Sequence, residues 1–189
     1  MNKRSWTIGL AVGVGIALAS GRAAAGQFPF KGSLSGTVIS TEMDINRDGV
    51  KNGLFVGGAK STLGPSTVQA LAGEFVLSGS VTCPSGYVGL TETPGTGGNV
   101  FRFDSTGDLL FEKDTSSTLC FDPVTGLFFG SGAGDITGGT GRFAGATGSF
   151  EYTHCTGNTL FFEQPPGDHG FFTDICEFIG TINTTKRRR

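Results

Sequence analysis

The chain has 189 residues and a formal net charge of −2, with 33 glycines, 17 phenylalanines and four cysteines. Three of its 14 basic residues lie within the first 25 positions and four form the terminal run 186–189, so the body between them is strongly acidic. An acidic body repels nucleic acid and anionic membrane surfaces, and we expect neither as a partner.

The first 25 residues have the three parts of a secretory signal. The basic residues Lys3 and Arg4 precede an apolar stretch at 6–18, and the segment ends on the small residues Ala23, Ala24 and Ala25. An apolar stretch of this length is too short to span a hydrocarbon core of ~30 Å, so no membrane span is predicted. We expect cleavage after Ala25 and a secreted or periplasmic protein. Residues 26–185 would then form one domain, followed by a solvated basic tail at 186–189.

The four cysteines are Cys83, Cys120, Cys155 and Cys176. An even number in an exported chain predicts two disulfides, with three connectivities open. Zinc sites usually bring cysteines in closely spaced pairs, which this chain lacks. We favour Cys83–Cys120 and Cys155–Cys176, because the second pair lies symmetrically about the turn at 164–168, as cross-strand partners in a hairpin would.

Beyond the signal, the predicted elements are all strands separated by turns rich in Gly, Pro, Asp and Ser. In chain order they are expected at residues 30–40, 54–61, 70–82, 86–92, 100–104, 109–113, 118–121, 127–136, 143–155, 159–163 and 170–183. Residues 105–108 and 122–126 have hairpin-turn chemistry. A sheet without helices to cover it must close into a barrel or pack as a sandwich. Glycines within the strands favour the closed antiparallel barrel, since they permit bends at its corners.

One segment carries a family resemblance. Residues 138–150, GGTGRFAGATGSF, resemble the turn and strand that recur in the allene oxide cyclase/dirigent superfamily of β-barrels, with supporting similarity at 108–111 and 178–182. The resemblance implies an eight-stranded antiparallel barrel, in which the surplus predicted strands are broken halves of longer ones. In that family this motif builds the turn and the barrel wall. The resemblance also admits a homo-oligomer.

That superfamily includes plant cyclases of unsaturated fatty-acid epoxides, proteins that steer phenoxy-radical coupling, and bacterial cyclases of natural-product pathways. What the resemblance implies is a dry barrel that holds a small apolar ligand, with cyclase or isomerase activity as an extension. The alternative is a non-catalytic structural or surface-associated protein, stapled by disulfides and stabilised by calcium. Phenylalanine can be buried without a polar partner, so we expect the ligand to meet phenylalanines. The expected ligand-binding residues are Phe101, Phe103, Phe111, Phe143 and Phe150.

Three charged residues are the catalytic candidates. Glu74 and Glu151 lie within long predicted strands, and Arg102 lies between apolar residues, where we expect a buried cation. A carboxyl group can serve as a general acid or base when burial shifts its pKa. No cofactor for chemistry is predicted.

Residues 44–50 form a candidate calcium loop. Oxygen ligands would come from Asp44, Asn46, Asp48 and the Val50 carbonyl, with a glycine for the sharp turn. The twelfth loop position is Phe55, where an EF-hand has a glutamate, and flanking helices are missing from the pattern. The other interpretation is an ordinary polar turn between two strands.

Overall fold

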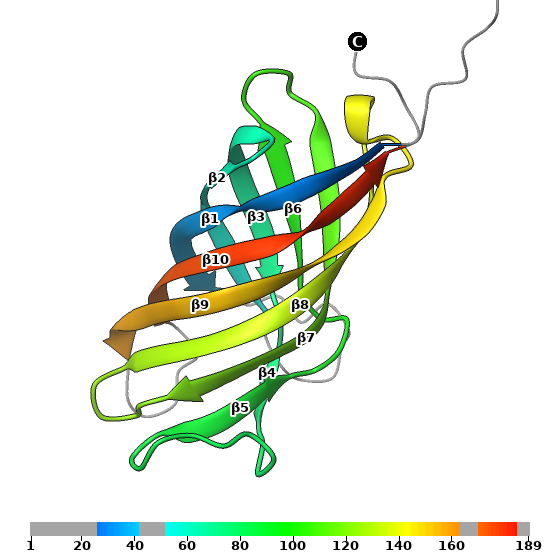
Figure 1. The fold of residues 1–189 in the computed structure, drawn as a ribbon. Helices are drawn as coiled ribbons and strands as arrows, with labels where there is room; N and C mark the ends of the chain where they lie inside the picture. Colours follow the sequence, from blue (N-terminus) through cyan, green and yellow to red (C-terminus); the bar gives the residue numbers. More distant parts are fainter. Residues whose placement is uncertain (1–25, 42–51, 163–169, 185–189) are drawn as a thin grey trace, which may run out of the picture.

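A computed structural model describes residues 26–41, 52–162 and 170–184 (Figure 1). These residues form ten strands and one short 3-10 helix, and none of their helices is long and apolar enough to cross a membrane. The strands are β1 (Gly26–Ser40), β2 (Gly53–Ser61), β3 (Gly64–Ala72), β4 (Phe75–Leu77), β5 (Val88–Glu92), β6 (Gly98–Phe103), β7 (Leu109–Phe121), β8 (Leu127–Gly139), β9 (Thr147–Phe162) and β10 (Gly170–Thr184), with the helix at Gly141–Phe143.

The strands close into an antiparallel barrel, as the sequence predicts. Around the ring, the order is β7, β6, β3, β2, β1, β10, β9 and β8, and pairing of β8 with β7 completes the circle. Strands β4 and β5 extend the sheet beyond the ring, with β5 paired to the far end of β7 (Figure 1). The result is a closed eight-stranded barrel with two additional strands.

The two additional strands are continuations of ring strands. On β7, residues 109–113 pair with β6, and residues 118–121 pair with β5. On the other side, β3 pairs with β6 while β4 pairs with β5. Strands β3 and β4 therefore follow one line, as do β5 and β6, each interrupted by a short non-strand segment. This confirms the expectation that surplus strands are halves of longer ones.

Some predicted boundaries were wrong. The strand expected at 70–82 begins at Gly64 and stops at Ala72, and only Phe75–Leu77 follows as strand. Residues 109–121 form a single strand, with a bulge near Asp114, where two strands were expected at 109–113 and 118–121. Likewise, the segments expected at 143–155 and 159–163 are covered by the single strand β9, which begins only after the helical turn.

Both predicted hairpin turns are present. The Phe103 amide donates to the Asp108 carbonyl at 3.0 Å, and the Asp122 amide donates to the Leu127 carbonyl at 2.8 Å. Gly107 and Gly126 have φ angles of 70° and 75° within these turns, a region that glycine enters without steric cost. The turn chemistry of the sequence thus fixes where β6 joins β7 and where β7 joins β8.

Phenylalanine fills one half of the barrel. Phe30 is fully buried and contacts three other rings, with centroid distances of 5.5 Å to Phe101, 5.8 Å to Phe150 and 4.7 Å to Phe178. Phe103 and Phe143 lie closer to the end of the barrel in this half, and their ring centroids are 4.9 Å apart. This half of the interior is solid aromatic core, and edge-to-face ring pairs of this kind add to the energy of burial.

Arg142 caps this filled half. Its guanidinium lies 4.7 Å from the centroids of Phe103 and Phe143, and it donates to the Leu63 carbonyl at 3.3 Å. It also lies 3.7 Å from an oxygen of Asp108. The arginine and phenylalanine of the GTGRF motif therefore hold one end of the barrel together, which agrees with the structural role that the resemblance implies.

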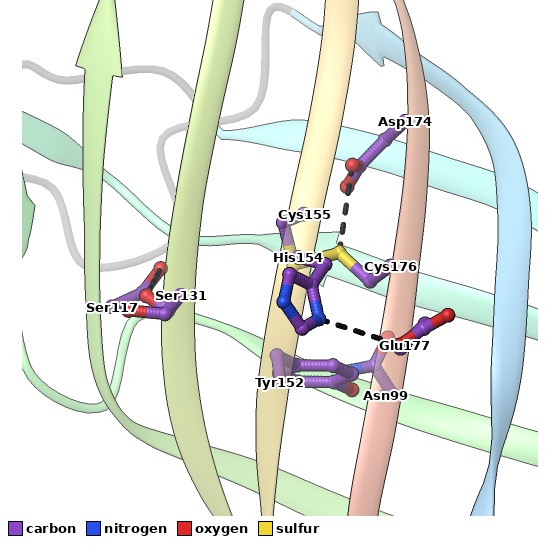
Figure 2. Close-up of a disulfide and its surroundings, with 9 residues drawn as sticks. All are labelled: Asn99, Ser117, Ser131, Tyr152, His154, Cys155, Asp174, Cys176 and Glu177. Carbon is purple, nitrogen blue, oxygen red and sulfur yellow. Dashed lines mark hydrogen bonds and ion pairs between the residues drawn. A yellow bond between two sulfur atoms is a disulfide. The ribbon is translucent and has the colours of Figure 1, made fainter.

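Both predicted disulfides are present. Cys83 pairs with Cys120, with 5.6 Å between the Cα atoms, and ties the segment after β4 to the end of β7. Cys155 pairs with Cys176, with a Cα separation of 4.0 Å, and joins β9 to β10 across their hairpin (Figure 2). The second bridge faces the barrel interior, because Cys176 is buried and packs on the core.

Candidate functional site

The half of the barrel opposite the Arg142 cap is hollow. It contains a cavity of about 460 Å³, within the size range of small-molecule sites. The apolar side chains of its wall come from strands all around the barrel and from the extension formed by β4 and β5. They include Leu34, Val38, Phe55, Phe75, Leu90, Leu119 and Phe128.

Four carboxyl groups also line this cavity: Glu74, Glu92, Asp114 and Asp174. Glu74 lies in the break between β3 and β4, and Glu92 ends β5 just before the break that leads into β6. Asp114 lies at the bulge of β7, and Asp174 comes from β10 on another side of the barrel. The strand irregularities thus place acidic side chains at the hollow end.

A hydrogen-bonded group forms the polar part of the wall. The Asn99 amide donates both to a carboxyl oxygen of Glu112 and to the Tyr152 hydroxyl, the latter at 2.9 Å. Glu112 is 5% exposed, and its other oxygen has no hydrogen-bond partner among the described residues. A side chain at Gly134 would overlap that oxygen, so the glycine makes room for the buried carboxyl.

Glu92 and Asp114 converge beside Gly97. A side chain at Gly97 would overlap an oxygen of each carboxyl group, which shows how closely both approach the same backbone. Glu92 is 5% exposed, and within the described part of the chain its Oε1 atom has no hydrogen-bond partner. Two acidic groups therefore meet in a poorly solvated place.

Burial raises the pKa of these acids. Desolvation, helped by the nearby Asp114 charge, raises the pKa of Glu92 to about 8. Burial likewise raises the pKa of both Glu112 and Asp114, which lie close together, and it raises the pKa of Asp174 to about 6. A carboxyl group whose pKa lies above 7, such as that of Glu92, keeps its proton at neutral pH and can donate it or share it in a hydrogen bond.

Asp174 has a second neighbour, the Cys155–Cys176 disulfide. One Asp174 oxygen lies 3.6 Å from the Cys176 sulfur, as Figure 2 shows. A disulfide sulfur carries no proton, so this contact is a hydrogen bond only when Asp174 is protonated. Burial favours that protonated form, which agrees with the raised pKa of Asp174.

The structure separates the three predicted catalytic residues. Glu74 is buried at the cavity, as expected, and accepts a hydrogen bond from the Asn52 amide at 3.2 Å. The expected burial of Arg102 and Glu151 is wrong, because both are exposed on the outer barrel surface. Each follows an inward-facing phenylalanine, Phe101 or Phe150, and neighbouring side chains on a strand point to opposite faces.

The five predicted ligand-binding phenylalanines do not line the cavity. Phe101, Phe103, Phe143 and Phe150 belong to the filled half, and Phe111 is half-buried beside the inward-facing Leu110. Phe143 is buried although an unbroken strand would place it on the same face as the exposed Glu151. The helical turn at Gly141–Phe143 interrupts the alternation between them.

The candidate calcium ligands Asp44, Asn46, Asp48 and Val50 lie outside the described residues. Within the ranges that the structure describes, no group of three His, Cys, Asp or Glu side chains is arranged to hold a metal ion. The calcium loop therefore stays a prediction.

Sequence reasoning missed Glu92, Glu112, Asp114 and Asp174. For three of them a usable signal existed. Asp174 has the same alternation as Cys176, Phe178 and Ile182, and Glu112 has that of Leu110, so a strict two-residue period would have placed both inside. Asp114 has the same alternation as Glu112, two residues before it, whereas Glu92 ends β5 beside a break, where no period could be followed.

Comparisons with known proteins add little to this picture. No protein-family model and no curated protein matches the chain. Among solved structures, it is similar to a pterocarpan synthase dirigent protein, with a TM-score of 0.30 and 12% sequence identity, over 87% of this chain and 88% of that one. The barrel assignment rests on the strand pairing.

Proposed function

We propose that the barrel holds a small, largely apolar molecule in the cavity at its hollow end. The observation that supports this most is the combination of a cavity of about 460 Å³ with apolar walls and a few convergent acidic groups. Small-molecule sites usually have this composition, with polar groups that orient the ligand. A protein with a purely structural role would gain stability by filling this space, as it fills the other half with phenylalanine.

A second candidate function is a cyclase or isomerase, favoured by the pairing of Glu92 with Asp114. A carboxyl group that keeps its proton at neutral pH can protonate an oxygen of the ligand, and a neighbouring carboxylate can accept a proton. The apolar walls would exclude water and fix the folded shape of a flexible substrate. This activity matches what the resemblance to the allene oxide cyclase/dirigent superfamily implies, and we propose membership of that superfamily.

We also propose that the protein works outside the cytoplasm, after removal of residues 1–25. Two disulfides support this location, because such bonds persist in oxidising compartments. The basic start, apolar stretch and small residues before Gly26 support it independently.

Filling the cavity tests the proposed binding. The mature protein is expected to take up a neutral hydrophobic dye such as Nile red with micromolar affinity, and Ala72→Phe should weaken uptake at least tenfold. Ala72 lines the cavity, so the added ring would occupy ligand space. The measurement is dye fluorescence during titration with protein.

The matched control is Ala133→Phe on β8, which adds the same ring at a residue that does not line the cavity. It should bind the dye as the original protein does. If neither the original protein nor the control takes up the dye, the structural alternative replaces this proposal.

A further inference from the structure

The cavity has an excess of acidic groups. Four carboxyl groups line it and Glu112 lies directly behind, whereas none of the described lining residues is Lys, Arg or His. Lys113 is exposed and directs its amine toward Gly95, on the outside of the strand break. A carboxylate is costly to bury without a partner, so each ionised group here requires a proton or a cation.

One of these acids has an oxygen that lacks a hydrogen-bond partner among the described residues. The acid is Glu92, which is only 5% exposed and lines the cavity. Its Oε1 atom is the one without a partner in the described part of the chain. The nearest carboxyl group is Asp114, which approaches the same glycine. Two acceptors that converge on one point, with one oxygen unused, favour a donor that carries positive charge.

The walls decide which kind of cation fits. No three-ligand metal group exists in the described ranges, and the surroundings are leucine, valine and phenylalanine side chains. An inorganic ion would leave this apolar surface facing water. An organic ammonium ion satisfies both parts of the cavity, since its charged end meets the carboxyl groups and its hydrocarbon body meets the walls.

We infer that the cavity binds a small organic amine in its ammonium form, with the charged nitrogen between Glu92 and Asp114 and the apolar body against the walls. This inference rests on the proposed function and names its ligand class. The ammonium hydrogens would occupy the unused Glu92 oxygen and the neighbouring Asp114 oxygen, and the bound charge would offset the acidic excess.

Binding should depend on pH with a defined sign. Asp114 is the charge that acts on Glu92, and the other titratable groups at this cavity are Glu74 from the β3–β4 break, Glu112 from β7, Asp174 from β10 and the Tyr152 hydroxyl from β9. Since burial raises the pKa of Glu92 to about 8, a proton occupies it at lower pH and must leave when the ammonium ion binds. An alkylamine stays cationic to about pH 10. Its affinity should therefore rise with pH, by about tenfold per unit below pH 7 when one proton is released.

The test compares hexylammonium with hexan-1-ol by calorimetric titration of the disulfide-bonded protein. We expect hexylammonium to bind at least tenfold more tightly at pH 8, with that advantage shrinking as the pH falls to 6. In Glu92→Gln the advantage should drop to twofold or less. The matched control Glu177→Gln removes an exposed carboxylate on the outer face and should leave the advantage intact. Melting curves verify that each variant folds, and Asp114→Asn provides a second cavity variant.

The outcomes separate the two proposals. Equal binding of hexan-1-ol and hexylammonium at every pH overturns the ammonium inference and leaves the proposed function standing. An ammonium advantage that persists in both Glu92→Gln and Asp114→Asn overturns the inference as well. If neither compound binds, and the neutral dye also fails to bind, the proposed function falls together with the inference.

Discussion

Replacement of Phe30 by Ala is expected to lower the free energy of unfolding by about 3–5 kcal/mol, the range typical of a large buried ring. Phe30 is fully buried and contacts Phe101, Phe150 and Phe178, so the deletion leaves a void that surrounding rings cannot fill. Because β1 lies between β2 and β10, the loss would affect the centre of the barrel wall. Chemical denaturation followed by far-ultraviolet circular dichroism measures the effect.

The matched control is Phe129→Ala. This ring is 38% exposed and contacts Tyr87 on the barrel exterior, at a centroid distance of 5.4 Å. Its removal should lower the free energy of unfolding by about 1 kcal/mol or less, since the ring is only partly buried. Equal losses in the two variants would show that the aromatic cluster around Phe30 is not the stabilising core.

Removal of the Cys155–Cys176 disulfide is expected to destabilise the protein by about 3 kcal/mol, because the bridge closes a loop of 21 residues in the unfolded chain. For a domain of this size, that corresponds to a melting temperature lower by ~6–12 °C. The double variant Cys155→Ala/Cys176→Ala tests this in a thermal melt. The same change at Cys83 and Cys120, which are 37 residues apart, should give a loss of about 4 kcal/mol.

The two bridges should differ in their effect on ligand uptake. Cys155 and Cys176 line the cavity, and the Cys176 sulfur contacts Asp174, whereas neither Cys83 nor Cys120 is part of that wall. Loss of the first bridge should weaken dye binding more than loss of the second. An unchanged melting temperature in the Cys155/Cys176 variant would contradict the stabilising role of this bridge.

The barrel could be predicted from the sequence because its signals are local. Turn residues at 105–108 and 122–126 specify hairpins, and the GTGRF segment marks one end of the barrel. Strand continuity could not be predicted. The polar run at 114–117 resembles a turn, yet β7 continues through it as a bulge, because pairing with β8 on its other side holds both halves in line.

The site was predicted only in part, because its residues also depend on strand geometry that local patterns do not show. Glu74 was placed in the interior correctly, whereas Arg102 and Glu151 were assigned to the interior from their apolar neighbours. A residue next to an inward-facing residue on a strand points outward, so buried Phe101 and Phe150 would have placed Arg102 and Glu151 on the outer surface. The meeting of Glu92 with Asp114 depends on two strand irregularities that are distant in sequence, and no local pattern encodes it.

The hollow end of the barrel is expected to keep at least one carboxyl group, that of Glu92, protonated at neutral pH. The most direct measurement is the ¹³C chemical shift of labelled glutamate carboxyl groups, followed by nuclear magnetic resonance from about pH 4 to pH 10. At least one resonance should titrate with a pKa of about 8 and disappear in Glu92→Gln, because burial and the Asp114 charge oppose ionisation of Glu92. A titration in which every glutamate carboxyl has lost its proton by about pH 6 would contradict the claim.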